Sequence, residues 1–170
     1  RSIHRSILFR QVDIQGTLST NLVNHGRIFF HGPVSITHST FQRSVDFSRA
    51  IFLQEIDFLD TKIRHEGFFI QAVFLEGVQF TKMQFGSHTR FHKAVFSGPS
   101  SFQEVEFPGL AEFLEVGFQQ KTDFSHAHFM QGTGFSGSQF QESPDFSKSV
   151  FDRETFFRFV QFEKGAKFRA

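Results

Sequence analysis

The chain has no cysteine, no tryptophan and no tyrosine among its 170 residues. Without cysteine there can be no disulfide, no thiolate metal site and no cysteine nucleophile. Eighteen basic side chains nearly balance seventeen acidic ones, and a formal charge of +1 does not indicate a nucleic-acid partner. No stretch approaches the roughly 18 consecutive apolar residues of a membrane-spanning helix, and no signal peptide is visible. The length fits one domain, and its most unusual feature is 29 phenylalanines.

The phenylalanines recur with a period of eleven residues. From Phe47 onward the steps between them alternate between five and six residues, and Ile63 fills the one vacancy. We expect these rings to form the core stack: Phe47, Phe52, Phe58, Phe69, Phe74, Phe80, Phe85, Phe91, Phe96, Phe102, Phe107, Phe113, Phe118, Phe124, Phe129, Phe135, Phe140, Phe146, Phe151, Phe157 and Phe162. Extended toward the N-terminus, the same spacing predicts core positions at Ile3, Leu8, Ile14, Ser19, His25, Phe30, Ile36 and Phe41.

A second column of residues indicates that each repeat unit is a short strand. A small or β-branched residue stands two positions before most of these phenylalanines, as Val45, Ala72 and Val116 do. Residues two apart in an extended chain face the same side, so each unit points one small and one large side chain inward. In an α-helix, steps of five and six would turn the ring by about 140° and about 240°, which leaves no single apolar stripe.

Short strands joined by tight turns must coil. Four sides of five, six, five and six residues close a square coil of 22 residues. Each phenylalanine then stacks on its equivalent in the next coil, and each coil bonds only to its neighbours. Roughly seven such coils, spaced about 4.8 Å apart, give a rod about 36 Å long.

Three segments resemble the pentapeptide-repeat motif. Residues 45–48 (Val-Asp-Phe-Ser), 122–125 (Thr-Asp-Phe-Ser) and 144–147 (Pro-Asp-Phe-Ser) share its order of small residue, Asp, central ring and Ser. The resemblance covers essentially the whole chain, closely from residue 36 and loosely before it. It implies an all-β fold, a right-handed quadrilateral parallel β-helix. The alternating period and the nearly invariant Phe centre depart from the family's regular five-residue pattern.

The resemblance and the period together predict a single solenoid domain over residues 1–170. Residues 1–35 are expected to be degenerate first coils or an N-terminal cap, and residues 36–168 regular repeats. The chain begins at Arg1 without Met and stops in the middle of a motif at residues 168–170, so we expect the natural chain to be longer.

The sequence contains no catalytic motif that we recognise: no P-loop, no GxSxG, no HExxH and no dinucleotide fingerprint. A solenoid without insertions is also expected to offer flat or convex faces and no lid, whereas catalysis needs a concave pocket. We therefore expect no enzymatic activity, no catalytic residue and no cofactor. His126 and His128 lie one coil after Glu104 and Glu106, but solvated histidines facing carboxylates explain this pattern better than a metal site.

Stacking of successive coils predicts two charged columns. The first alternates mostly in sign, which supports the rod at modest energy per exposed pair. Its members are Asp60, Lys82, Glu104, His126 and Lys148. The second is basic and is interrupted by Gln71; it could bind an anion, although a solvated face is the better interpretation. Its members are Arg5, Arg27, Arg49 and Lys93.

One outward column is apolar where a polar one is expected. It holds β-branched and aromatic residues just before every fourth core position, with further apolar residues just after. The full set is Ile7, Phe9, Phe29, Ile51, Leu53, Val73, Leu75 and Val95. The column turns polar at Gly117, Gln139 and Gln161. A contiguous apolar strip of this kind usually marks an interaction surface, for a protein partner or a second copy; the alternative is that β-branched residues simply favour strands.

We therefore predict a non-enzymatic scaffold or protein–protein interaction module. One alternative is a mimic of duplex DNA that binds a type II topoisomerase, as some relatives do. The charge argues against it, because residues 31–144 carry a net charge of only −4, between +3 for residues 1–30 and +2 for residues 145–170. Another alternative is the rod domain of a protein whose membrane segment lies outside this chain. A bacterial source and a cytoplasmic rather than periplasmic location complete the expectations.

Overall fold

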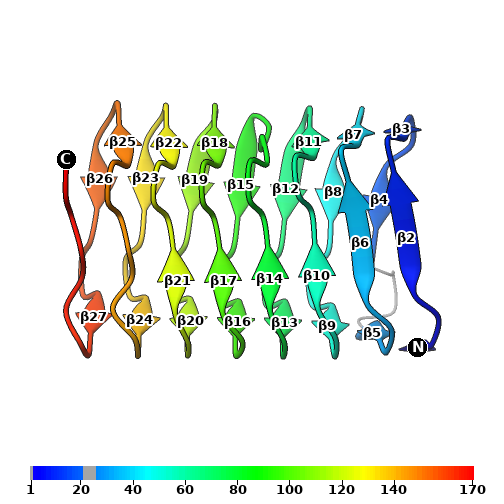
Figure 1. Cartoon of the computed structure of the whole chain (residues 1–170), viewed down its shortest axis with the longest axis horizontal. Helices are drawn as coiled ribbons and strands as arrows, with labels where there is room; N and C mark the ends of the chain where they lie inside the picture. The colour runs from blue at the N-terminus through cyan, green and yellow to red at the C-terminus, as the bar shows by residue number, and fades with distance from the viewer. Residues whose placement is uncertain (1, 21–25) are drawn as a thin grey trace.

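The computed structural model describes residues 2–20 and 26–170, and these residues form short parallel strands and no helix. The strands stack into four faces along one rod (Figure 1). The first face contains β1 (Ser2–Ile3), β5 (Phe29–Phe30), β9 (Ile51–Phe52), β13 (Val73–Phe74), β16 (Val95–Phe96), β20 (Gly117–Phe118), β24 (Gln139–Phe140) and β27 (Gln161–Phe162). The second contains β2 (Ile7–Arg10), β6 (Val34–Thr37), β10 (Ile56–Asp57), β14 (Val78–Gln79), β17 (Ser100–Ser101) and β21 (Thr122–Asp123).

The other two faces complete each coil. The third contains β3 (Asp13–Ile14), β7 (Thr40–Phe41), β11 (Lys62–Ile63), β18 (Glu106–Phe107), β22 (His128–Phe129) and β25 (Val150–Phe151), joined in the middle by bridges through Gln84. The fourth contains β4 (Leu18–Ser19), β8 (Val45–Asp46), β12 (Glu66–Phe68), β15 (His88–Arg90), β19 (Leu110–Glu112), β23 (Thr133–Gly134) and β26 (Thr155–Phe156). A quadrilateral parallel β-solenoid is thereby confirmed.

The register between neighbouring coils is constant from Phe29 onward. Phe52 pairs with Phe74, and Phe74 pairs with Phe96, each in a parallel ladder. Ser100 and Thr122, which are 22 residues apart, pair in the same way on the second face and share a hydrogen bond. The side-chain columns predicted from the sequence are therefore real neighbours along the rod. Since every ladder is parallel and in register, chemically alike residues stack directly on one another.

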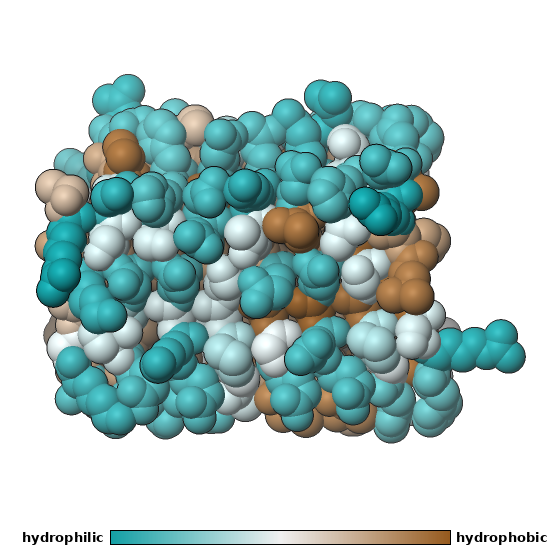
Figure 2. Space-filling model, in the orientation of Figure 1, coloured by the Kyte–Doolittle hydropathy of each residue, from teal (hydrophilic) through white to brown (hydrophobic). Residues whose placement is uncertain are grey.

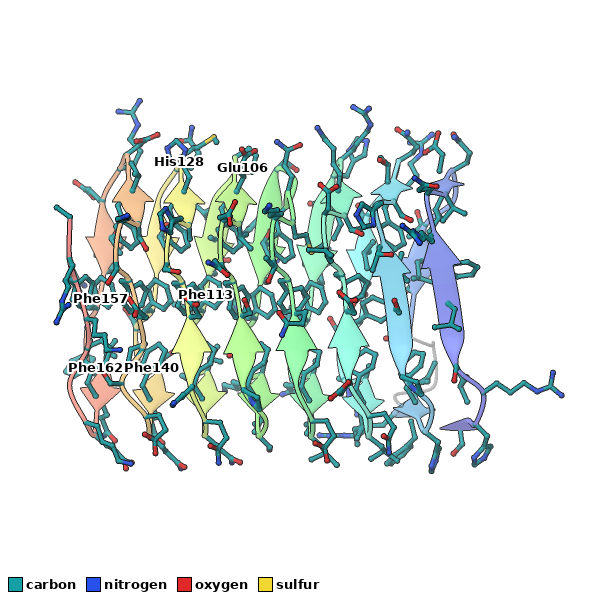
Figure 3. All side chains as sticks on the ribbon, viewed as in Figure 1. Glu106, Phe113, His128, Phe140, Phe157 and Phe162 are labelled. Carbon is teal, nitrogen blue, oxygen red and sulfur yellow. The ribbon has the colours of Figure 1, made fainter. Side chains whose placement is uncertain are left out.

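The core consists of stacked phenyl rings. Equivalent rings of successive coils lie nearly parallel, with centroids 4.5 Å apart for Phe118 and Phe140 and 5.2 Å apart for Phe140 and Phe162 (Figure 3). Rings of neighbouring columns meet edge to face, as Phe102 and Phe113 do at 85°. Both arrangements suit the ring quadrupole and are worth about 0.5–1.5 kcal/mol per pair beyond burial. The predicted core rings are buried from Phe47 through Phe146, and Phe151, Phe157 and Phe162 are half-buried against the same core.

The alternation of five and six residues corresponds to two kinds of corner. In a five-residue step the chain closes a β-turn: the amide N of Ala72 donates to the carbonyl O of Phe69 at 3.1 Å. The third residue of that turn, Gln71, has φ +56°, which is the left-handed conformation of a type II turn. The equivalent residue eleven positions on, Lys82, has φ +57°. Six-residue steps use one more residue, and none of those between Phe41 and Phe162 contains a positive φ.

The first coil departs from the predicted register. Ile3 pairs with Phe30 and Ile14 with Phe41. This spacing is 27 residues, as between the hydrogen-bonded Val12 and Ser39, rather than the 22 residues of the later coils. The five additional residues fall between β4 and β5, a connection that includes residues 21–25, so the predicted core position His25 lies outside the described residues.

The longer first coil makes two predicted core positions wrong. Leu8 pairs with the outward Ser35 and is 70% exposed, and Ser19 pairs with Asp46 and is also exposed. The inward side chains of this coil are instead aliphatic residues such as Ile7 and Leu18, which pack half-buried against the core. The period extrapolated backward placed Leu8 in the core, whereas the next residue, Phe9, pairs with the buried Ile36 and takes that core position.

Candidate interaction surface

The apolar strip lies on the first face of the rod. Phe29, Ile51, Val73 and Val95 follow one another on β5, β9, β13 and β16 in a continuous parallel ladder. All four side chains are half-buried; Leu53 beside them is also half-buried, and Leu75 is 43% exposed. In the view of Figure 2, apolar surface gathers over the N-terminal part of the rod, whereas the C-terminal part is mostly hydrophilic.

Two residues expected on this strip lie elsewhere. Ile7 points inward and pairs with Val34, because the first coil is five residues longer than the others. Phe9 lies on the second face, where it pairs with Ile36 and remains 47% exposed. The position predicted for Ile7 is taken by Ser2, which pairs with Phe29. We define the apolar strip from here on as Phe29, Ile51, Leu53, Val73, Leu75 and Val95.

The strip ends where the sequence predicts its end. Gly117 follows Val95 on the same ladder, and Gln139 and Gln161 continue it. A Cβ atom at Gly117 would meet no other atom within 4 Å, so the ladder is open at this point. The first face is therefore apolar over its N-terminal half and polar over its C-terminal half.

The basic column borders the strip at a corner. Arg27, Arg49 and Lys93 occupy equivalent positions with Gln71 between the last two, and the Lys93 ammonium lies 3.5 Å from a Glu115 carboxylate oxygen. Arg5 does not belong to this column, because the longer first coil places it over Gly32, where a Cβ atom would lie 2.7 Å from the Arg5 carbonyl carbon. The anion-binding interpretation thus loses one of its four residues, and a carboxylate neutralises another.

The alternating charged column forms as predicted at the opposite corner. Lys82 Nζ lies 3.7 Å from Glu104 Oε2, and a coil earlier His38 Nε2 lies 3.9 Å from Asp60 Oδ2. The members occupy positive-φ corners, so their side chains project into solvent. Exposed pairs of this kind contribute little to stability, and we assign them no further function.

The histidine and glutamate pairs on the third face are occupied by other partners. Glu106 and His128 lie on neighbouring strands (Figure 3). Glu106 accepts a hydrogen bond from the Gln84 amide at 2.6 Å, and His128 Nε2 lies 2.8 Å from Asp152 Oδ2. Within residues 2–20 and 26–170, no group of three or more histidines and carboxylates has the geometry of a metal site.

A charged cluster on the fourth face was not predicted. Glu112 Oε2 lies 2.7 Å from His88 Nε2, 3.3 Å from His92 Nε2 and 3.1 Å from Arg90 Nε. Burial alone would raise the pKa of the Glu112 carboxyl, but the His88 hydrogen bond and the attraction of His92 and Arg90 outweigh burial and lower this pKa. A search for opposite charges in adjacent coils, including positions diagonal to the column, would have found this cluster.

We looked in the described residues for features that would support the two alternatives, a mimic of duplex DNA and the rod domain of a membrane protein. In the part of the chain that the structure describes, no outward column carries three carboxylates in succession, whereas a duplex mimic needs a continuous acidic stripe. None of the described residues belongs to a helix that could cross a bilayer.

The architecture defines a class, the parallel β-solenoid repeat proteins, in which each coil binds only its neighbours. A family model of pentapeptide repeats, described with nine copies, matches residues 80–128. The chain therefore carries pentapeptide repeats in these coils, as the motif resemblance predicts. No curated protein and no solved structure matches the chain.

Proposed function

We propose that this protein is a non-enzymatic interaction module in which a rigid solenoid presents the apolar strip to another protein. The observation that supports this most directly is the in-register ladder Phe29, Ile51, Val73 and Val95 at outward positions of the first face. Outward positions of a one-layer solenoid face water and have no structural need for apolar side chains. Grouped in one ladder, they offer a partner a contiguous surface whose burial is favourable.

The rigidity of the rod supports the same function. Strip residues are held to the preceding coil by backbone hydrogen bonds, as Val73 N donates to Ala50 O at 2.9 Å and Val95 N to Ala72 O at 2.9 Å. The rings beneath are close-packed, so the strip is ordered before any partner arrives. Pre-ordering lowers the entropic cost of association.

The absence of cysteine makes a sharp test available. We would introduce one thiol into the strip with Leu75→Cys and, in the same outward column two coils on, a control thiol with Gln119→Cys. Both positions are exposed. Maleimide labelling rates would be measured for the purified protein and in native extract of the source cell. A partner on the strip should slow labelling of Leu75→Cys about tenfold in extract, which corresponds to roughly nine-tenths occupancy, and leave Gln119→Cys unchanged.

A third variant separates binding from indirect effects. Adding Ile51→Lys to Leu75→Cys places a charge beside the thiol and should restore rapid labelling in extract. Equal labelling rates for Leu75→Cys in buffer and in extract would contradict the proposed function of the strip.

A further inference from the structure

A hollow interrupts the fourth face of the rod, whereas the apolar strip lies on the first face. Its volume is about 330 Å³, and its floor is the outward side of β23, formed by Gly132, Gly134 and Ser136. Leu110 and Leu114 line one side, and Phe156 lines the other. The hollow exists because one coil lacks the large outward side chains that its two neighbours carry.

The fold itself does not require these glycines. Neither Gly132 nor Gly134 has a positive φ. A Cβ atom at Gly132 would come within 3.3 Å of Leu110 Cδ1, and one at Gly134 within 3.1 Å of Leu114 Cδ2, both of which are ends of flexible side chains. A larger residue could therefore stand at either position with a small shift of a leucine. The hollow therefore results from the choice of small side chains at these positions, and the backbone conformation does not require it.

An exposed phenylalanine stands beside this hollow. Phe159 is 90% exposed and follows the hollow-lining Phe156 by three residues. It occupies a positive-φ corner with φ +57°, a conformation that is unfavourable for a bulky residue. At the other positive-φ corners of the described chain stand polar residues or glycine. Neither backbone geometry nor core packing accounts for a phenyl ring at this corner.

We propose that two copies of this chain associate through this surface, with Phe159 of each copy seated in the hollow of the other. A protruding ring and a ring-sized apolar hollow on one patch are self-complementary about a two-fold axis, so the contact is made twice and closes as a dimer. The seated ring meets Leu110, Leu114 and the half-exposed ring of Phe156. Aromatic side chains in such pockets are typical interface anchors.

The charges around the hollow favour the same arrangement. Arg158, which directly precedes the protruding ring, lies over the Phe156 ring at 5.4 Å and makes no ion pair with any described residue. Glu154, next to the hollow floor, likewise has no ion pair within the described residues. Seating Phe159 brings Arg158 of one copy to the rim that carries Glu154 and Glu112 of the other. The contact patch is small, so the dimer should be weak and depend on concentration.

The test is solution mass by light scattering across a range of protein concentrations. The unmodified chain should approach twice the mass of one chain as concentration rises. Phe159→Ser removes the protruding ring, and Gly134→Gln fills the hollow. Each should weaken association at least about tenfold, as loss of an interface anchor does. Gly117→Gln, at an outward strand glycine of another face, is the matched control and should leave association unchanged.

Mixing the two variants decides between a direct contact and an indirect effect. Phe159→Ser retains an open hollow and Gly134→Gln retains its ring, so an equimolar mixture restores one of the two contacts and should associate more tightly than either variant alone. A mixture no tighter than its components, or a monomer at every concentration, would overturn the proposal.

The same measurement distinguishes this surface from the apolar strip. The double variant Ile51→Lys/Val73→Lys should leave the dimer intact. Loss of the dimer in that variant, with Phe159→Ser still dimeric, would overturn the hollow as the contact and assign self-association to the strip.

Discussion

The first coil and the later coils form the same four faces of parallel strands, but the side chains that point inward differ, and so does how completely they are buried. Between Phe30 and Phe162, equivalent rings stack from one coil to the next without a change of register, and the central ones are fully buried. In the first coil the inward residues include Ile3, Ile14 and Leu18, which are half-buried, and the register is five residues longer. An insertion is tolerated where no ring column has to be kept in phase.

A cavity marks the boundary between these two regions. Apolar side chains of the first coil, among them Ile7 and Phe9, line a space of about 170 Å³ together with Phe30 and Phe47. In this coil, aliphatic side chains such as Ile3, Ile7 and Leu18 stand beside the ring of Phe9 and leave the space unfilled. Three coils later the core is closed, and Phe91 has no exposed surface.

The largest expected effect is on the free energy of unfolding, when a core side chain is truncated to alanine in the central coils or in the first coil. Phe91→Ala should lower the free energy of unfolding by about 3–5 kcal/mol, because the ring is fully buried and its neighbours are held by stacking. Leu18→Ala should cost only about 1 kcal/mol, since that side chain is half-buried. Guanidinium unfolding followed by circular dichroism measures both. Equal costs would show that the first coil is packed as firmly as the centre.

A smaller effect should appear as pH dependence in the central coils. The lowered pKa of Glu112 means that its carboxylate stabilises the folded state above the ordinary glutamate pKa of 4.5, and this contribution is lost as pH falls through the lower folded value. Glu112→Gln should cost about 1 kcal/mol at pH 7 and progressively less below pH 4.

Asp13 provides the matched comparison in the first coil. Its carboxylate accepts hydrogen bonds from the neutral amides of Gln15 at 2.8 Å and Gln42 at 2.7 Å. Asp13→Asn should therefore change the unfolding free energy less than Glu112→Gln does at pH 7. A constant cost for Glu112→Gln from pH 7 to pH 3 would contradict the assigned ionic contacts.

The smallest effect should be equal in both regions. Gln11 in the first coil and Gln71 in the centre both adopt a positive φ, 53° and 56°. Replacing either by glycine removes the left-handed penalty and should raise the unfolding free energy by about 0.5–1 kcal/mol. Gln54→Gly, at an exposed six-residue corner without positive φ, should instead lower it slightly. A gain confined to Gln71→Gly would show that corner strain depends on core packing.

Much of the fold could be predicted because the repeat is nearly uninterrupted. The phenylalanines from Phe47 to Phe146 at the repeat positions are all buried, as predicted, because the spacing of five and six residues alternates without interruption. The prediction failed in the first coil because Leu8, Ser19 and Ile7 do not distinguish a regular register from one with five additional residues. The strip was predicted from Ile7 to Val95, and its placement was wrong at Ile7 and Phe9, which depended on that register.

Some surface features could likewise be predicted from the sequence, and others could not. Columns that rely on direct stacking of one coil on the next, such as Lys82 above Glu104, could be predicted from spacing. The cluster around Glu112 also joins residues outside one column: Arg90 lies directly along it, whereas His88 and His92 approach from the positions on either side. Side chains therefore lean toward neighbouring positions as well as along the rod. The hollow depends on how far the two leucines beside Gly132 and Gly134 extend, which no periodicity describes.

The sequence by itself determined the strand, the coil and the core, because a ring at every fifth and sixth residue can be buried together in only one way. The tertiary structure alone decided the length of the first coil, the order of charges around Glu112 and the hollow beside Phe159. These depend on distances between side chains of different coils, and such distances are established only when the coils have stacked.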